Sequence, residues 1–132
     1  MHKVIILLVK TNSEEDAEDL VVEFLTNYGN TVYDWYEIGG RWDKLLGKSN
    51  VMKLSKCLDI VKDYKKDLQK EIEEAWNTLL ESKDGYHARQ YAHLKDGDFY
   101  HDSNVFNITT GVAEEIPEDI DKYYAVVVDI HY

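Results

Sequence analysis

Two apolar runs at opposite ends of the chain constrain the fold more than any other feature of the sequence. His2 to Val9 and Tyr123 to His131 are dense in Val, Ile and Leu. Strands of this composition are covered by other elements on both faces. We therefore predict that the two runs are buried strands lying side by side in the middle of one sheet, as in ferredoxin-like layouts.

Hydrophobic periodicity predicts two helices between these runs. The first spans about Ser13 to Asn27 and ends at Gly29, and the second runs from about Val51 to Ser82. At 1.5 Å per residue the second helix would be about 45 Å long, more than a domain of this size needs. We expect it either to break near Ser55 to Asp59 or to overhang and offer a homodimer face along its stripe from Leu54 to Leu79. Packing across the sheet is the other explanation of that stripe.

Three further segments have the residue pattern of strands. They are Thr31 to Ile38, Tyr86 to Leu94 and Phe99 to His101, the last two joined by a tight turn at Lys95 to Asp98. Asn104 to Glu118 is predicted to be irregular. The order β-α-β-α-β-β-β indicates an α+β fold, with helices on one face of a largely antiparallel sheet. The 132 residues are predicted to form a single domain.

Charge and cysteine content exclude several classes of protein. Lys and Arg number 15 against 26 Asp and Glu, a formal net charge of -11, which repels nucleic-acid backbones. The single cysteine, Cys57, forms no internal disulfide, fits a reducing compartment and is expected to be a small buried residue. The apolar run from Val4 to Val9 is too short for a signal peptide or a membrane span. We expect a cytoplasmic protein that binds neither nucleic acid nor membrane.

Much of the negative charge lies on the first predicted helix, where six acidic residues occur without a basic one. These residues could meet a basic surface on a partner protein. Alternatively they only complement the helix dipole and keep the chain soluble. The six candidate partner-binding residues are Glu14, Glu15, Asp16, Glu18, Asp19 and Glu23.

The segment from Tyr33 to Asp43 has the most unusual composition in the chain. It contains one of only two arginines, placed between a glycine pair and a tryptophan. Glycines let the backbone approach a ligand closely, and a guanidinium binds phosphate or carboxylate at two points. Trp35, Tyr36 or Trp42 could stack on a ligand ring. The structural alternative is a bend at the strand end, with the tryptophan in the core and the arginine paired to Asp34 or Asp43. The candidate ligand-binding residues are Tyr36, Gly39, Gly40, Arg41 and Trp42.

Asp129 and His131 are candidates for acid-base chemistry. They are two residues apart on a predicted strand, so their side chains share one face of the sheet. A carboxylate beside an imidazole fixes the tautomer of the ring, as general-base sites do. The alternative is a satisfied polar pair at the edge of the core. The histidines of the predicted hairpin, His87, His93 and His101, match no compact zinc pattern, so we predict neither a metal nor a cofactor.

The sequence resembles a family of small uncharacterised proteins encoded by bacteriophages and prophages. The resemblance rests on Gly39-Gly40-Arg41-Trp42, on Lys95-Asp96-Gly97 followed by Phe99-Tyr100, and on the terminal strand that ends in Val-Asp-x-His. It implies a viral or mobile-element setting and names no activity. Two short motifs that occur together in distant parts of a chain suggest a shared site, and adjacent central strands would bring Arg41 and His131 toward one region.

Two functions follow from these observations. The first is a non-enzymatic inhibitor that binds a basic surface on a host factor, for example in counter-defence of the anti-CRISPR kind, since the chain contains no known catalytic motif. The alternative is a protein that binds a nucleotide or another small anion, or a weak phosphoryl hydrolase, using the Gly-Gly-Arg-Trp segment with Asp129 and His131.

Overall fold

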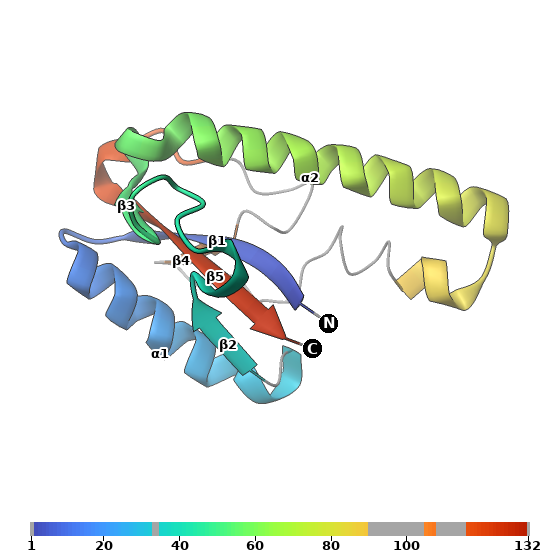
Figure 1. Ribbon diagram of the computed structural model, residues 1–132, viewed down its shortest axis with the longest axis horizontal. Helices are drawn as coiled ribbons and strands as arrows, with labels where there is room; N and C mark the ends of the chain where they lie inside the picture. The colour runs from blue at the N-terminus through green and yellow to red at the C-terminus, as the bar shows by residue number, and fades with distance from the viewer. Residues whose placement is uncertain (1, 33–34, 90–104, 108–115, 132) are drawn as a thin grey trace.

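The computed structural model describes residues 2–32, 35–89, 105–107 and 116–131 (Figure 1). In the described residues the elements are five strands, two long α-helices and two short 3-10 turns. In chain order the elements are β1 (His2–Lys10), α1 (Glu14–Val32), β2 (Trp35–Ile38), η1 (Gly40–Trp42), β3 (Val51–Lys53), α2 (Leu54–Ser82), β4 (Val105–Asn107), η2 (Ile120–Lys122) and β5 (Tyr123–His131).

The sheet is built around the two apolar end strands, as the sequence predicts. Its strand order is β2-β5-β1-β4, with β3 also paired to β5, and every described pairing is antiparallel, which confirms the α+β class. β1 and β5 pair along nine residues, from His2 opposite His131 to Lys10 opposite Tyr123. The two ends of the described chain therefore lie next to each other in the centre of the sheet.

One edge of β5 is shared by two short strands. β2 pairs with residues 128–131 and β3 with residues 124–126. Between them, the carbonyl of Val127 accepts from the Gly39 amide at 2.8 Å, and the Val127 amide donates to the Asn50 carbonyl at 3.0 Å. Residues 40–49, called the edge loop below, thus leave the sheet and return to it at the same residue of β5.

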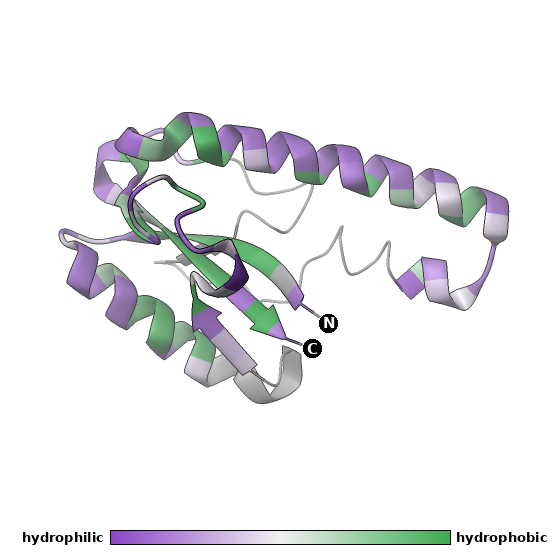
Figure 2. Ribbon diagram, in the orientation of Figure 1, coloured by the Kyte–Doolittle hydropathy of each residue, from purple (hydrophilic) through white to green (hydrophobic). Residues whose placement is uncertain are grey.

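The two long helices cover opposite faces of the sheet (Figure 1). α1 packs Val21 and Leu25 against Ile5, Leu7 and their neighbours, and α2 packs its first turns against the other face. The predicted placement of helices on one face is therefore wrong, and the ferredoxin-like layout is not confirmed. The physical reason is that β1 and β5 are apolar on both faces, so each face needs a cover. Figure 2 shows this concentration of apolar residues in the two central strands.

The long helix α2 both breaks and overhangs. Cys57 has non-helical dihedral angles (φ −128°, ψ 17°), so the kink lies inside the predicted interval. The C-terminal end of α2 extends beyond the sheet in Figure 1, and there Trp76 and Leu80 are 43% and 52% exposed. Whether this end binds a second copy of the chain stays a prediction.

The first helix is longer than the sequence predicts. It continues through Gly29 to Val32, so residues 31 and 32 are helical rather than the start of a strand. A glycine inside a helix costs only about 1 kcal/mol relative to alanine, which tertiary structure readily offsets. β2 needs only four residues, because it pairs with only the last four residues of β5.

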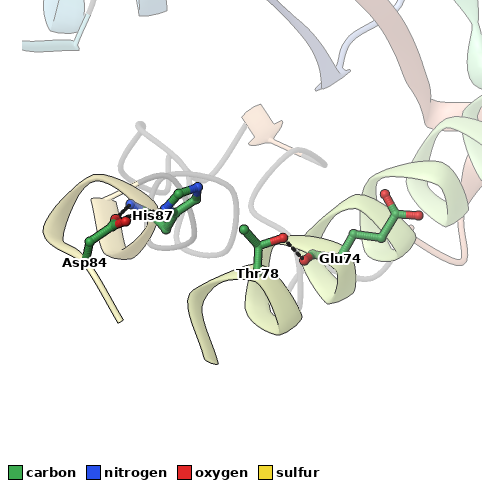
Figure 3. Close-up of polar contacts among 4 residues, drawn as sticks. All are labelled: Glu74, Thr78, Asp84 and His87. Atoms are coloured by element: carbon green, nitrogen blue, oxygen red, sulfur yellow. Dashed lines mark hydrogen bonds and ion pairs between the residues drawn. The ribbon is translucent and has the colours of Figure 1, made fainter. Parts of the chain in front are cut away.

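The strand predicted over Tyr86 to Leu94 is also wrong in its first residues, which are helical. Lys83 takes a left-handed conformation (φ 54°), which ends α2. Its amide donates the last hydrogen bond of the helix to the Leu79 carbonyl, at 2.8 Å. Residues 85–89 are then helical, and the Asp84 carboxylate caps them by accepting from the His87 amide at 2.8 Å (Figure 3). This bond to the His87 backbone, followed by a bond to the His87 ring, holds the pKa of Asp84 below its usual range. The rest of the predicted hairpin, including His93 and His101, lies outside the described residues.

Two short strands replace other expectations. Residues 51–53 were expected to begin the second helix but form β3, because their backbone pairs with β5. Residues 105–107 were expected to be irregular but form β4 beside β1. Runs of three residues are set by their pairing partner rather than by their own pattern.

The buried thiol of Cys57 gives a test of this packing. Its side chain lies in the core beneath α2 and its Sγ donates to the Lys53 carbonyl at 3.4 Å. Burial raises the pKa of Cys57 to about 11. We expect native protein at pH 8 to react with a disulfide reagent at least about a hundredfold more slowly than protein unfolded in urea. Equal rates would show that this part of the core is open.

Candidate functional site

Asp129 is the one buried side chain with a charge in the described part of the chain. It is 1% exposed and lies in β5, where residues 123–128 and 130 are buried and almost entirely apolar. Strand alternation places it on the α2 face of the sheet with Val127. A buried carboxylate is costly unless hydrogen bonds compensate for the lost water.

Two groups from distant parts of the chain provide that compensation. His2 Nδ1 lies 2.7 Å from Asp129 Oδ1, and the Arg41 amide donates to Oδ2 at 3.1 Å. His2 begins β1 and Arg41 lies in η1, at the start of the edge loop. The Asp129 carboxylate therefore fixes the positions of the His2 imidazole and of the Arg41 backbone amide.

The glycine pair is required by this geometry. Gly40 has φ +53°, and a Cβ at this position would lie 2.5 Å from both Cβ and Oδ2 of Asp129. Gly39 has φ +80°, and its missing Cβ leaves room for the Asn50 amide. That amide in turn donates to Asp43 Oδ1 and accepts from the Lys44 backbone, both at 2.7 Å, which closes the edge loop.

Aromatic rings form a row across three strands beside the carboxylate. The register sets His2 opposite His131 and His131 opposite Trp35. The His2 ring is edge-to-face with both neighbours, at centroid distances of 5.0 Å to His131 and 6.0 Å to Trp35. Trp35 is 46% exposed, so its indole borders both the histidine row and solvent. We call His2, Trp35, Arg41, Asp129 and His131 the sheet-end site.

The structure brings together some of the predicted residues and separates others. Gly40, Arg41, Asp129 and His131 gather at this end of the sheet. Tyr36 instead points to the opposite face and packs against the α1 core. Trp42 packs against the α2 core, as its structural alternative predicts.

One member of the site has no place among the sequence predictions. It is His2, the imidazole that contacts Asp129, whereas Trp35 beside it was a candidate stacking ring. The signal was available in principle, because pairing the two end strands antiparallel from their outer ends sets His2 against His131. It requires knowing the register, which local sequence does not give.

The edge loop carries positive charge in an acidic chain. Arg41, Lys44 and Lys48 are exposed, against a single acid, Asp43, which accepts a hydrogen bond from Asn50. Among the described residues the Arg41 guanidinium forms no ion pair, so its predicted pairing with Asp43 does not form; Asp34 lies outside that range. The sheet-end site thus includes one cation of the edge loop, Arg41, and the same loop carries two more, Lys44 and Lys48.

The six acidic residues of α1 lie on a different part of the molecule. All six are exposed on the helix that covers the face opposite Asp129, and no ion pair joins them to any residue in the described ranges. They form a surface separate from the sheet-end site.

Neither metal nor membrane features occur in the part of the chain that the structure describes. There, no three His, Cys, Asp or Glu side chains group so as to hold a metal ion. No helix in the same residues has the length and apolar character needed to cross a bilayer.

Comparison with known proteins gives no family. No protein-family model, no curated protein and no solved structure matches this chain.

Substituting Gly40 tests whether the loop is fitted to the carboxylate. Gly47 offers a matched control, since it also has positive φ (+117°) but no atom lies within 4 Å of the place that a Cβ would take. We expect Gly40→Ala to lower the free energy of unfolding by about 3 kcal/mol and Gly47→Ala by about 1 kcal/mol. Hydrogen exchange at the Arg41 amide should accelerate only in Gly40→Ala. Equal effects of the two substitutions on both measurements would contradict the fit.

Proposed function

We propose that the chain binds a small anion that carries an aromatic ring, such as a nucleotide, at the sheet-end site. The observation that supports this most is the buried carboxylate of Asp129, bound at once by His2 and by the Arg41 backbone. Valine or isoleucine would fill this position of a central strand without the cost of burying a charge. The charge organises groups at an exposed sheet edge, which is the pattern of a functional site rather than of a core.

Each part of the site has a role in this proposal. The Arg41 guanidinium binds phosphate at two points, with Lys44 and Lys48 adding positive field on the same loop. The half-exposed Trp35 indole provides a surface for the ring of the ligand. Asp129 and Gly40 hold the loop so that these groups are already in place before binding, which lowers the entropic cost of the complex.

A thermal-shift series tests this function. Mononucleotides and cyclic dinucleotides at about a hundred times their Kd should raise the Tm by roughly 10 °C, because ligand binds only folded protein. Arg41→Ala should abolish the shift. Arg89→Ala is the matched control, because Arg89 is the only other arginine, is exposed, and lies in the helical segment past α2.

The absence of any shift across the series would contradict the proposal. So would a shift that Arg41→Ala and Arg89→Ala reduce to the same extent, because the anion would then be held by overall charge.

A second candidate function is inhibition of a host protein by a chain of phage or mobile-element origin acting in the host cytoplasm. The observation that favours it is the set of six exposed α1 acids with no ion pair among the described residues. Such a surface would attract a basic host protein over a distance of about 10 Å, the screening length at 0.1 M salt.

Charge neutralisation tests this second function. Changing the six α1 acids to Gln or Asn should abolish capture of a basic protein from bacterial lysate, and capture by the unmodified chain should weaken steeply with salt. The control neutralises six exposed acids of α2, which gives the same change of net charge. These acids are Asp59, Asp63, Asp67, Glu73, Glu74 and Glu81. Capture that is indifferent to salt, or lost equally in both variants, would contradict a role for α1.

A further inference from the structure

The contact between His2 and Asp129 has the geometry of a positioned acid-base group. An ionised carboxylate only accepts hydrogen bonds, so the 2.7 Å contact favours the tautomer of His2 that carries its proton on Nδ1. The other ring nitrogen, Nε2, then carries the lone pair when the ring is neutral, and it points away from the carboxylate. The His2 side chain is 20% exposed while Asp129 is 1% exposed, so the imidazole contacts a buried carboxylate and keeps part of its own surface in solvent.

A comparison within the chain shows what is particular to this pair. His87 also places Nδ1 against a carboxylate, 2.8 Å from Asp84, but there the carboxylate is 49% exposed and belongs to a helix cap. At His2 the carboxylate is 1% exposed and also holds the start of a cationic loop. Of these two pairs, only that of His2 has a buried carboxylate that also binds the Arg41 backbone, with an exposed indole beside the ring.

We propose that His2 is the general base of a phosphoester hydrolase at the sheet-end site, with Asp129 as its positioning residue. This inference rests on the proposed anion site, and its substrate class is an aromatic or nucleoside phosphodiester. A water molecule attacks phosphorus and gives its proton to Nε2 of His2. The new P–O bond forms as the P–O bond to the leaving group breaks, and the leaving group departs with that electron pair. Arg41 neutralises the phosphate oxygens.

The test uses bis(p-nitrophenyl) phosphate, a phosphodiester whose leaving group needs no proton and is coloured. The whole chain should release p-nitrophenolate and should also show a thermal shift with this compound. His2→Gln should lower kcat by about 10²- to 10⁴-fold while the thermal shift persists. Asp129→Asn should lower kcat with little change in KM, because an amide can donate to Nδ1 and reverse the tautomer. His87→Gln, the matched control, should change neither.

The outcomes separate this inference from the proposed function. A thermal shift without p-nitrophenolate release, or hydrolysis by His2→Gln at the rate of the unmodified chain, would overturn the inference and leave the anion site in place. If the unmodified chain shows neither the thermal shift nor the hydrolysis, both the inference and the proposed function are overturned. A reduced kcat with the shift retained in His2→Gln would support the inference even if Asp129→Asn does not fold.

Discussion

The carboxylate of Asp129 is the interaction on which the site depends. It lies near the end of an apolar strand, and its burial is offset by two hydrogen bonds, to the first residue of β1 and to the first turn of the edge loop. Segments separated by 127 and 88 residues in sequence are thereby joined at one point. A buried charge seldom adds net stability compared with an apolar residue, so its value here lies in the geometry that it imposes.

The edge loop, which begins at the contact with Asp129, forms an exposed surface at the edge of the sheet. Because the edge loop starts and ends opposite Val127, its ends are fixed by the sheet, and Asn50 closes its interior. The loop then presents three cations in a chain whose net charge is -11. A long polyanion would meet the repulsion of the whole molecule, whereas a small anion meets only the local positive field. The charge distribution therefore favours a small phosphate ligand over a nucleic-acid strand.

The sequence predicted what depends on composition and failed where tertiary contacts decide. Apolar runs at both ends were enough to predict the central strand pair. Helix length was enough to predict either a break near Ser55 to Asp59 or an overhang, and the break occurs at Cys57. The prediction that both helices lie on one face of the sheet was wrong, although the central strands were expected to be covered on both faces. No local pattern says which helix covers which face. β3 and β4 have three residues each, too few for a pattern of their own. His2 was missed because its relation to Asp129 is a matter of register between strands.

The tautomer of His2 tests the central claim most directly. Long-range ¹H–¹⁵N NMR of the imidazole distinguishes a proton on Nδ1 from one on Nε2. If the buried carboxylate holds the ring, neutral His2 carries its proton on Nδ1, and that proton exchanges slowly with water. A dominant Nε2–H tautomer, the form preferred by a free imidazole side chain in water, would show that Asp129 does not organise this end of the sheet.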